Sequence, residues 1–361
     1  MMRLPWYDKT VPHAVLDILR GCNCRCAECY NADRQVVCKS IDDLKAEVAV
    51  IRRKRNLTTI SLSGGEPLMH PQVLDIIRWL HHEEGLKVDS LTNAILFDDA
   101  MAAKLAEAGL ELISLHIQKG QKRPDIEGRT LEELRREKGR IACAHGLFPA
   151  LVETMYAEDG DGFRSLAHFL RTAPEFEYAL VTVARKFEEI RGSVAQQDVP
   201  REPMLAAFRA EGYRPVVFVG GRIHRDVPRW YIFQSVQALD KDGKERAWNE
   251  MRPGLVERLF LWGYATLCHR SLHWVKTTSA KLKVRLLVNG LTGGHLSTFF
   301  FALRATLAGW TLKEKHIIVQ LPPYSLGDGR IEFCDNCPDA TVKKGTLRPV
   351  CLGDISEDAP L

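Results

Sequence analysis

Residues 21–30 read GCNCRCAECY and carry four cysteines within eight consecutive positions. They directly follow residues 14–19, an apolar run whose length and composition predict a β-strand. Cys22, Cys26 and Cys29 have the spacing CxxxCxxC, so three thiolates on one loop can hold three corners of a [4Fe-4S] cluster. The fourth iron then stays open to a substrate or a cofactor, which distinguishes a chemical cluster from an electron carrier with four cysteines.

The order of a strand followed by a helical pattern recurs six times between residue 14 and about residue 185. The expected strands are residues 14–19, 58–62, 87–91, 111–117, 148–155 and 178–184. Strands that alternate with helices pair in parallel through crossover connections. We therefore expect an α/β fold, a partial (β/α)6 barrel like a TIM barrel, with functional loops at the carboxyl ends of its strands.

Beyond residue 190 the alternation stops. We expect three parts: the barrel at residues 1–190, an apolar-rich insertion or substrate region at 191–315, and a cysteine-rich segment at 316–361. The last two form an α+β extension, whose expected elements are strands at 215–220 and 229–238 and aromatic-rich helices at 253–274 and 295–310. Large apolar side chains are usually core, so both helices are expected to pack against the barrel. The alternative is that these helices line a hydrophobic tunnel or contact a membrane surface.

A second motif, LSGGEP at residues 62–67, ends the second expected strand. CxxxCxxC after the first strand and GGEP after the second together resemble the radical S-adenosylmethionine (SAM) superfamily, over residues 14–185. The resemblance implies an enzyme that carries a [4Fe-4S] cluster on the three cysteines and binds SAM at the open iron. Reductive cleavage of SAM would then give a 5′-deoxyadenosyl radical that abstracts hydrogen from the substrate.

The resemblance also implies contacts between SAM and residues of this chain. The GGEP motif would hold the methionine end of SAM, because glycines let the backbone approach a ligand closely. The Thr-Asn pair after the third strand stands where many members have TNG or TNA, and the aromatic residue after the last cysteine would meet adenine through its backbone. The residues concerned are Gly64, Gly65, Glu66, Pro67, Thr92, Asn93 and Tyr30.

Three polar residues, Ser114, His116 and Gln118, alternate along the fourth expected strand and just past its end. Side chains two positions apart lie on the same face of a strand, so these three are expected to face the inside of the barrel. Inward polar groups near a strand end suit a contact with SAM or with substrate. A structural role for each of them is the alternative.

A second cysteine group lies near the end of the sequence. Cys334, Cys337 and Cys351 have the spacing CxxC-x13-C. It resembles the auxiliary-cluster motif of the molybdenum-cofactor cyclase that acts on GTP and of other twitch or SPASM-type radical SAM enzymes. The resemblance implies a second [4Fe-4S] cluster. Gly345 and the stretch KGTLRPVC at residues 344–351 predict a small hairpin between the last two cysteines. Zinc is the alternative, with Cys268 or His269 as a further ligand.

Zinc is also the alternative for the first cysteine group, with Cys24 or Cys38 as an additional ligand. A zinc site would leave the GGEP motif unexplained, so the cluster is favoured. Cys24 departs from the family pattern and offers a CxCxxC register. The three-residue gap after Cys22 fits the family better, and Cys24 is expected to be a bystander.

Composition limits the class of protein further. The 361 residues carry a formal net charge of +4, which is small for a dedicated nucleic-acid binder. We find no signal peptide and no apolar run of about 18 residues, so we expect a cytoplasmic protein without a transmembrane helix. In that compartment the ten cysteines indicate metal or cluster ligation rather than a disulfide framework.

These observations favour a radical SAM enzyme that acts on a peptide or a small metabolite. Its expected partners are SAM, that substrate, and an electron donor such as flavodoxin or ferredoxin. One alternative is an enzyme for a lipid or another apolar substrate, with peripheral membrane contact. The other is a non-catalytic iron-sulfur or zinc scaffold, against which the intact cysteine triad and GGEP motif argue.

Overall fold

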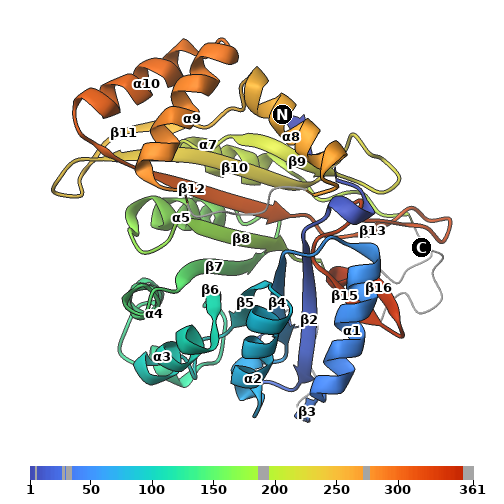
Figure 1. Ribbon diagram of the computed structural model, residues 1–361. Helices are drawn as coiled ribbons and strands as arrows, with labels where there is room; N and C mark the ends of the chain where they lie inside the picture. Colours follow the sequence, from blue (N-terminus) through green and yellow to red (C-terminus); the bar gives the residue numbers. More distant parts are fainter. Residues whose placement is uncertain (5, 27–28, 30–34, 186–194, 271–276, 353–361) are drawn as a thin grey trace.

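The computed structural model describes residues 1–4, 6–26, 29, 35–185, 195–270 and 277–352. Its centre is a twelve-stranded sheet flanked by helices (Figure 1). Six neighbouring strands run parallel in the order β8-β7-β6-β5-β4-β2. They are β2 (His13–Arg20), β4 (Thr59–Gly64), β5 (Lys87–Thr92), β6 (Leu110–His116), β7 (Phe148–Met155) and β8 (Tyr178–Val183). The predicted α/β fold with six parallel strands is thus confirmed.

Helices cross from each parallel strand to the next and cover the outside of the sheet. They are α1 (Ile41–Lys54), α2 (Val73–Arg78), α3 (Asp99–Ala108), α4 (Leu131–Ala144) and α5 (Gly160–Thr172). Capping boxes begin two of them, because Ser40 accepts a hydrogen bond from the N–H of Asp43 and Thr130 accepts one from the N–H of Glu133. The large core cluster lies between these helices and the sheet.

The short strand β3 (Val37–Cys38) pairs antiparallel with the end of β2, so the cysteine-rich loop leaves the sheet at β2 and returns beside it. Two 3₁₀ turns, η2 (Pro67–Met69) and η4 (Pro124–Ile126), follow β4 and β6, and the π-helical turn η3 (Trp79–Glu83) extends α2. The loops at the carboxyl ends of β2, β4, β5 and β6 therefore lie on one side of the sheet, as parallel pairing requires.

The sheet continues past β8 with strands from the second half of the chain. β12 (Thr311–Gln320) pairs parallel with β8, and β10 (Pro228–Leu239) pairs antiparallel with β12. The outer strands are β9 (Pro215–Gly220), β11 (Glu245–Glu250) and β1 (Met2–Arg3). Ile317 and Val319 of β12 enter the main core, while His316, Ile318 and Gln320 alternate with them and face the other side.

Three helices form a cap over this second half of the sheet, at the top of Figure 1. They are α8 (Leu255–Leu267), α9 (Ser279–Thr292) and α10 (Leu296–Leu307), while α7 (Glu202–Ala210) packs beside α5. Leu282 and Leu286 of α9 and Ala302 of α10 form a small separate core with β10 and β12. The expectation that the aromatic-rich helices are core is wrong for α8, where Ala265 is the one buried residue, because α8 contacts the rest of the protein along a narrow strip.

The last described segment folds into two hairpins. One joins β13 (Tyr324–Ser325) to β14 (Ile331–Glu332), and the other joins β15 (Ala340–Lys343) to β16 (Thr346–Pro349) before the 3₁₀ turn η5 (Val350–Leu352). The second hairpin is the one expected between Cys337 and Cys351, and β15 packs on β2. No helix within the described ranges is both long and apolar enough to cross a membrane.

Candidate functional site

A cavity of about 1080 Å³ occupies the inside of the barrel. Alternate residues of the parallel strands line it, as Lys87, Asp89 and Leu91 do on β5. This period of two is what strands of a barrel present to its interior. Both cysteine groups line the same cavity, so the fold brings the two ends of the sequence to one site.

Cys22, Cys26 and Cys29 lie on the loop after β2, and all three line the cavity. Two side-chain amides donate hydrogen bonds to this group: Asn93 Nδ2 to Cys22 Sγ at 3.5 Å, and Gln121 Nε2 to Cys26 Sγ at 3.6 Å. Burial raises the pKa of the Cys22 thiol, and a bound metal would displace its proton. Donors aimed at sulfur stabilise the thiolate that then forms.

Gly64 and Gly65 allow the end of β4 to touch the base of the cysteine loop. A Cβ on Gly65 would lie 1.7 Å from the carbonyl oxygen of Gly21, and one on Gly64 would lie 2.1 Å from that of Leu19. Gly64 also has a φ of +127°, a backbone conformation that residues other than glycine rarely adopt. Both glycines line the cavity, and they form a cradle that any Cβ would fill.

Glu66 is buried, and three hydrogen bonds hold its carboxylate. It accepts from Leu68 N at 3.0 Å, from Thr92 Oγ1 at 2.7 Å and from Asn93 N at 2.7 Å. Burial raises the pKa of Glu66, against the effect of these donors. Neither Glu66 nor Pro67 is among the residues that line the cavity. Glu66 thus fastens the end of β5 to the GGEP turn.

Thr92 and Asn93 line the cavity at the end of β5. Asn93 also donates to Asn23 Oδ1 at 2.7 Å, and its carbonyl accepts from Arg123 at 2.9 Å. Tyr30, expected to meet adenine, lies outside the described residues. The structure therefore brings the GGEP turn, the end of β5 and the cysteine loop into one connected network.

The alternation expected along β6 is confirmed, since Ser114, His116 and Gln118 all line the cavity. His116 Nε2 lies 2.9 Å from Gln118 Oε1, which also accepts from the N–H of Thr154 at 2.6 Å. Burial lowers the pKa of His116, so the neutral imidazole is the form that the site favours. The pair holds the carboxyl ends of β6 and β7 together.

Asp89 is a cavity residue that the sequence analysis missed. Its carboxylate accepts from Ser61 Oγ at 2.6 Å and from Ser114 Oγ at 3.0 Å, and these three residues come from adjacent strands. Burial raises the pKa of Asp89. The sequence offers one indication of this role. Asp89 is a single carboxylate within the strand β5, at a position that faces the inside of the barrel.

Cys334, Cys337 and Cys351 meet at the same cavity. Cys334 and Cys337 are buried in a small apolar cluster with Trp230, and burial raises the pKa of both Cys337 and Cys351. Each of these two thiols also lies close enough to Cys334 for their charges to repel. Three thiols gathered in this way lose their protons readily only to a metal.

Cys268 and His269, the further ligands considered for zinc, are exposed at the end of α8 and do not line the cavity. His269 Nδ1 is instead 2.7 Å from the hydroxyl of Tyr7. Of the additional ligands considered for the first group, Cys24 lines the cavity and Cys38 does not. Cys24 Sγ lies 3.9 Å from the carbonyl oxygen of Lys122.

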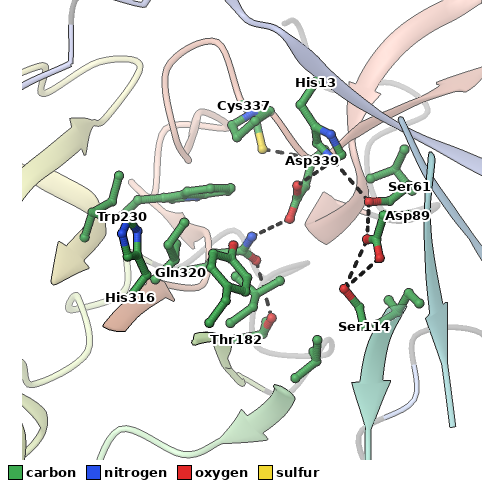
Figure 2. Close-up of a pocket in the computed structure, with 18 of the residues that line it drawn as sticks. His13, Ser61, Asp89, Ser114, Thr182, Trp230, His316, Gln320, Cys337 and Asp339 are labelled. Carbon is green, nitrogen blue, oxygen red and sulfur yellow. Dashed lines mark hydrogen bonds and ion pairs between the residues drawn. The ribbon is translucent and has the colours of Figure 1, made fainter. Parts of the chain in front are cut away.

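Asp339 spans the open edge of the barrel beside the second cysteine group. Figure 2 shows it between His13 on β2 and Gln320 on β12. Its Oδ1 lies 3.7 Å from His13 Nε2, and its Oδ2 accepts a hydrogen bond from the Gln320 amide. Burial raises the pKa of Asp339 to about 6. The C-terminal segment thereby closes the gap between the first and last strands of the barrel.

The donor atoms present suit iron-sulfur chemistry. Each cysteine group supplies three thiols to one cavity, and amides donate to two sulfurs of the first group. Within the described ranges, no three His, Cys, Asp or Glu side chains form a site for a single metal ion. A cubane takes a thiolate at each of three irons, so a group of three thiols that face one cavity fits it.

Comparison with known proteins finds relatives of residues 16–155. The family model of the Radical SAM superfamily matches residues 16–155. GTP 3′,8-cyclase of Chlorobaculum tepidum is 26% identical over 113 residues, which are 31% of this chain and 34% of that protein. AdoMet-dependent heme synthase of Methanosarcina barkeri is 34% identical over 107 residues, which are 28% of this chain and 29% of that protein. The chain thus spans about a third of the length of these relatives.

Among solved structures, SuiB of Streptococcus suis bound to S-adenosylmethionine superposes with a TM-score of 0.39 at 16% identity. The superposition covers 50% of this chain and 42% of SuiB. The matched residues 16–155 include the CxxxCxxC loop, the GGEP turn and the polar residues of β5 and β6 described above. Residues 16–155 of the chain therefore form a radical SAM domain, and the members of that superfamily use a [4Fe-4S] cluster and SAM.

Proposed function

We propose that this protein is an enzyme that cleaves SAM reductively and abstracts hydrogen from a substrate held inside its barrel. The observation that carries the proposal is the shared cavity. Cys22, Cys26 and Cys29 line it together with the ends of β4, β5 and β6. Its volume is about 1080 Å³, and it extends to the second cysteine group. The radical SAM domain supplies the reaction class, and the cavity supplies room for SAM and a substrate together.

The cluster would be held by Cys22, Cys26 and Cys29, and when bound it supplies the electron and the open iron that this superfamily uses on SAM. The amides of Asn93 and Gln121 would stabilise negative charge on two of the ligating sulfurs. Both amides come from loops at the carboxyl ends of strands, so the barrel itself sets the position of the donors.

Glu66 acts as a positioning residue in this proposal. Its carboxylate holds Thr92 and the backbone of Asn93, both of which lie where SAM is expected. The Gly64-Gly65 pair brings the same turn against the cysteine loop. The two glycines of the GGEP motif would then contact SAM, and Glu66 would support them without touching SAM.

Asp89 and Ser114 offer the substrate a polar anchor in the middle of the cavity. A buried carboxylate with two hydroxyl donors can still accept a hydrogen bond from a substrate hydroxyl or amine, because each oxygen has two lone pairs. Burial raises its pKa, so it takes up a proton more readily than an exposed aspartate does.

A second [4Fe-4S] cluster on Cys334, Cys337 and Cys351 is part of the proposal, with zinc as the rival. The support is that all three thiols line the cavity and are buried or half-buried together. Asp339 is the nearby carboxylate, and its backbone carbonyl already accepts a hydrogen bond from Cys337 Sγ at 3.5 Å. A cluster here would face the same cavity as SAM and the substrate.

The substrate is a peptide or small metabolite in the first form of the proposal. A lipid or another apolar molecule is a second candidate, favoured by the lining of the cavity beneath the cap. Val256, Phe260 and Leu261 of α8 and Val288 of α9 line it together with Trp230 of β10. A cavity that starts at a carboxylate and continues between apolar side chains suits a molecule with a polar group and an apolar chain.

The test uses anaerobically reconstituted protein, analysed for iron, sulfide and zinc and then given dithionite and SAM. A flavodoxin or ferredoxin is the electron donor expected in place of dithionite in the cell. About eight irons per chain and formation of 5′-deoxyadenosine would support both clusters and the radical chemistry. About four irons with one zinc would keep the reaction and replace the second cluster.

Little iron together with no SAM cleavage would contradict the proposal and leave the scaffold alternative. A matched pair of variants makes the result specific: Cys29→Ala should lose the activity and Cys143→Ala should keep it. Cys143 is exposed on α4, away from the residues that line the cavity.

A further inference from the structure

The cap over the sheet exposes an unusual amount of apolar surface. Twelve of the eighteen exposed large hydrophobic side chains among the described residues lie on α8, α9 and α10. On α8, Leu255, Leu259 and Trp262 follow the spacing of one helix face and are 58%, 57% and 61% exposed. Apolar patches of this kind on a monomer mark a surface that binds something.

The other two helices of the cap carry similar stripes. Val284 and Leu291 of α9 are 62% and 63% exposed, and Leu296 and Phe300 of α10 are 61% and 59% exposed. α9 packs against both α8 and α10, so the three helices form one continuous unit. The buried residues of α9 and α10 pack in the small core with β10 and β12, and the outward stripes are exposed to solvent in the described chain.

Charge on these helices has one predominant sign. Their sequences contain five Lys or Arg residues and a single acid, Glu257, which gives a net charge of +4. That equals the formal charge of the whole 361-residue chain. Glu257 is paired with Arg285, so the basic residues that remain at the surface include Arg258, Lys281 and Arg304. Lys and Arg beside exposed aromatic and aliphatic groups are typical of helices that lie in a membrane interface.

The cap also borders the cavity. Val256, Phe260 and Val288 are exposed to solvent and line the cavity as well, so they lie where the cavity opens. A molecule leaving a lipid surface at this point would enter between apolar side chains and reach the polar anchor at Asp89.

We propose that α8, α9 and α10 dock on the surface of an anionic phospholipid bilayer, with the opening of the cavity turned toward the lipid. The occupant is fixed by the combination of exposed apolar stripes with a basic surface and by their continuity with the cavity mouth. The evidence for docking comes from the three cap helices. The proposal extends the second candidate of the proposed function, in which the substrate is a lipid or another apolar molecule. It can be tested without SAM cleavage, so failure of one is distinguishable from failure of the other.

The experiment measures sedimentation of the full-length reconstituted protein with vesicles of phosphatidylcholine, with and without phosphatidylglycerol. Wild type should bind the vesicles that contain phosphatidylglycerol and should dissociate as salt is raised. Lys281→Gln/Lys283→Gln should weaken binding by about fivefold for each charge removed. The matched control Lys54→Gln/Lys104→Gln removes two exposed charges from α1 and α3, outside the cap, and should bind like wild type.

A second variant tests the apolar stripe. Leu259→Ser/Trp262→Ser changes two exposed residues that do not line the cavity, so it should lose vesicle binding and retain its fold by circular dichroism. Binding by this variant equal to that of wild type would overturn the proposal, as would absence of wild-type binding to phosphatidylglycerol vesicles. A wild-type dimer in light scattering that this variant abolishes, without vesicle binding, would overturn it too, because the cap would then be an interface between copies.

Discussion

The side-chain amide of Asn93, at the end of β5, donates a hydrogen bond to the sulfur of Cys22 at 3.5 Å. The contact joins the two motifs of the domain, because Glu66 of the GGEP turn holds the backbone N–H of the same asparagine. A donor to sulfur stabilises the more negative, reduced state of a cluster, and this raises its reduction potential. The residue thus connects the position of the expected SAM site to the electronic properties of the expected cluster.

Asn93→Leu removes this donor while keeping the volume of the side chain. We expect the reduction potential of the first cluster to fall by about 60 mV, which corresponds to roughly 1.4 kcal/mol for one electron. A potentiometric titration followed by electron paramagnetic resonance measures it. Asn249→Leu on β11, which loses a half-buried asparagine outside the cavity, serves as the control. Equal potentials for Asn93→Leu and wild type would refute the role of the amide.

Gly65→Ala tests the contact between the two motifs. The new Cβ would lie 1.7 Å from the carbonyl oxygen of Gly21, so the cysteine loop has to move. We expect the protein to bind about four fewer irons per chain than wild type in the same reconstitution, since the ligand geometry of the first cysteine group is lost. Gly263→Ala on α8, with no atom within 4 Å of its new Cβ, is the matched control and should bind iron normally.

Removal of the second cysteine group separates the two clusters. The triple change Cys334→Ala, Cys337→Ala and Cys351→Ala should lower the iron content by about four per chain. Formation of 5′-deoxyadenosine without added substrate should persist, because the first group is untouched. Iron and zinc analysis together with product chromatography checks both points. Unchanged iron with loss of one zinc would show that the rival metal occupies this site.

The buried amine of Lys315 should make the free energy of unfolding depend on pH. Its Nζ is buried and donates to the carbonyl oxygens of Ala173 at 3.0 Å and Phe176 at 2.6 Å. Burial lowers its pKa from 10.5 to about 7. Between these values the unfolded chain binds one more proton than the folded one, so the free energy of unfolding should rise with pH by up to ~1.4 kcal/mol per unit.

Lys315→Met should remove this slope, which chemical denaturation at several pH values between 7 and 9 measures. Lys313→Met, on the same strand with its amine at the surface, is the control and should keep the slope. A slope that is the same in wild type and Lys315→Met would show that the lysine is charged in the folded state over this range.

The parallel half of the fold could be predicted because its signals are local. Apolar runs, helix caps and glycine-ended turns recur at short spacing, and β2 and β4 to β8 follow them closely. β12 was missed as a neighbour of β8, since its partner lies more than a hundred residues away and no local pattern encodes that pairing. α9 was missed as well, although α8 and α10 were expected.

The site divides in the same way. Cysteine spacing identified both thiol groups, and strand alternation identified Ser114 and His116 as inward residues. Asp89 and Asp339 are single carboxylates, and their roles could not be predicted because they depend on partners that only the fold brings close. The exposure of α8 could not be predicted either, because an apolar helix in a core and one on a surface read alike.

We expect this cavity to support reductive cleavage of SAM through Cys22, Cys26 and Cys29. The most direct test is the amount of 5′-deoxyadenosine formed by the reconstituted protein with dithionite and SAM, for wild type, Cys26→Ala and Cys143→Ala. Wild type and Cys143→Ala should form product, and Cys26→Ala should form at least about a hundredfold less, because an essential ligand is removed. Equal product from all three proteins, or none from wild type that holds its full iron content, would contradict it.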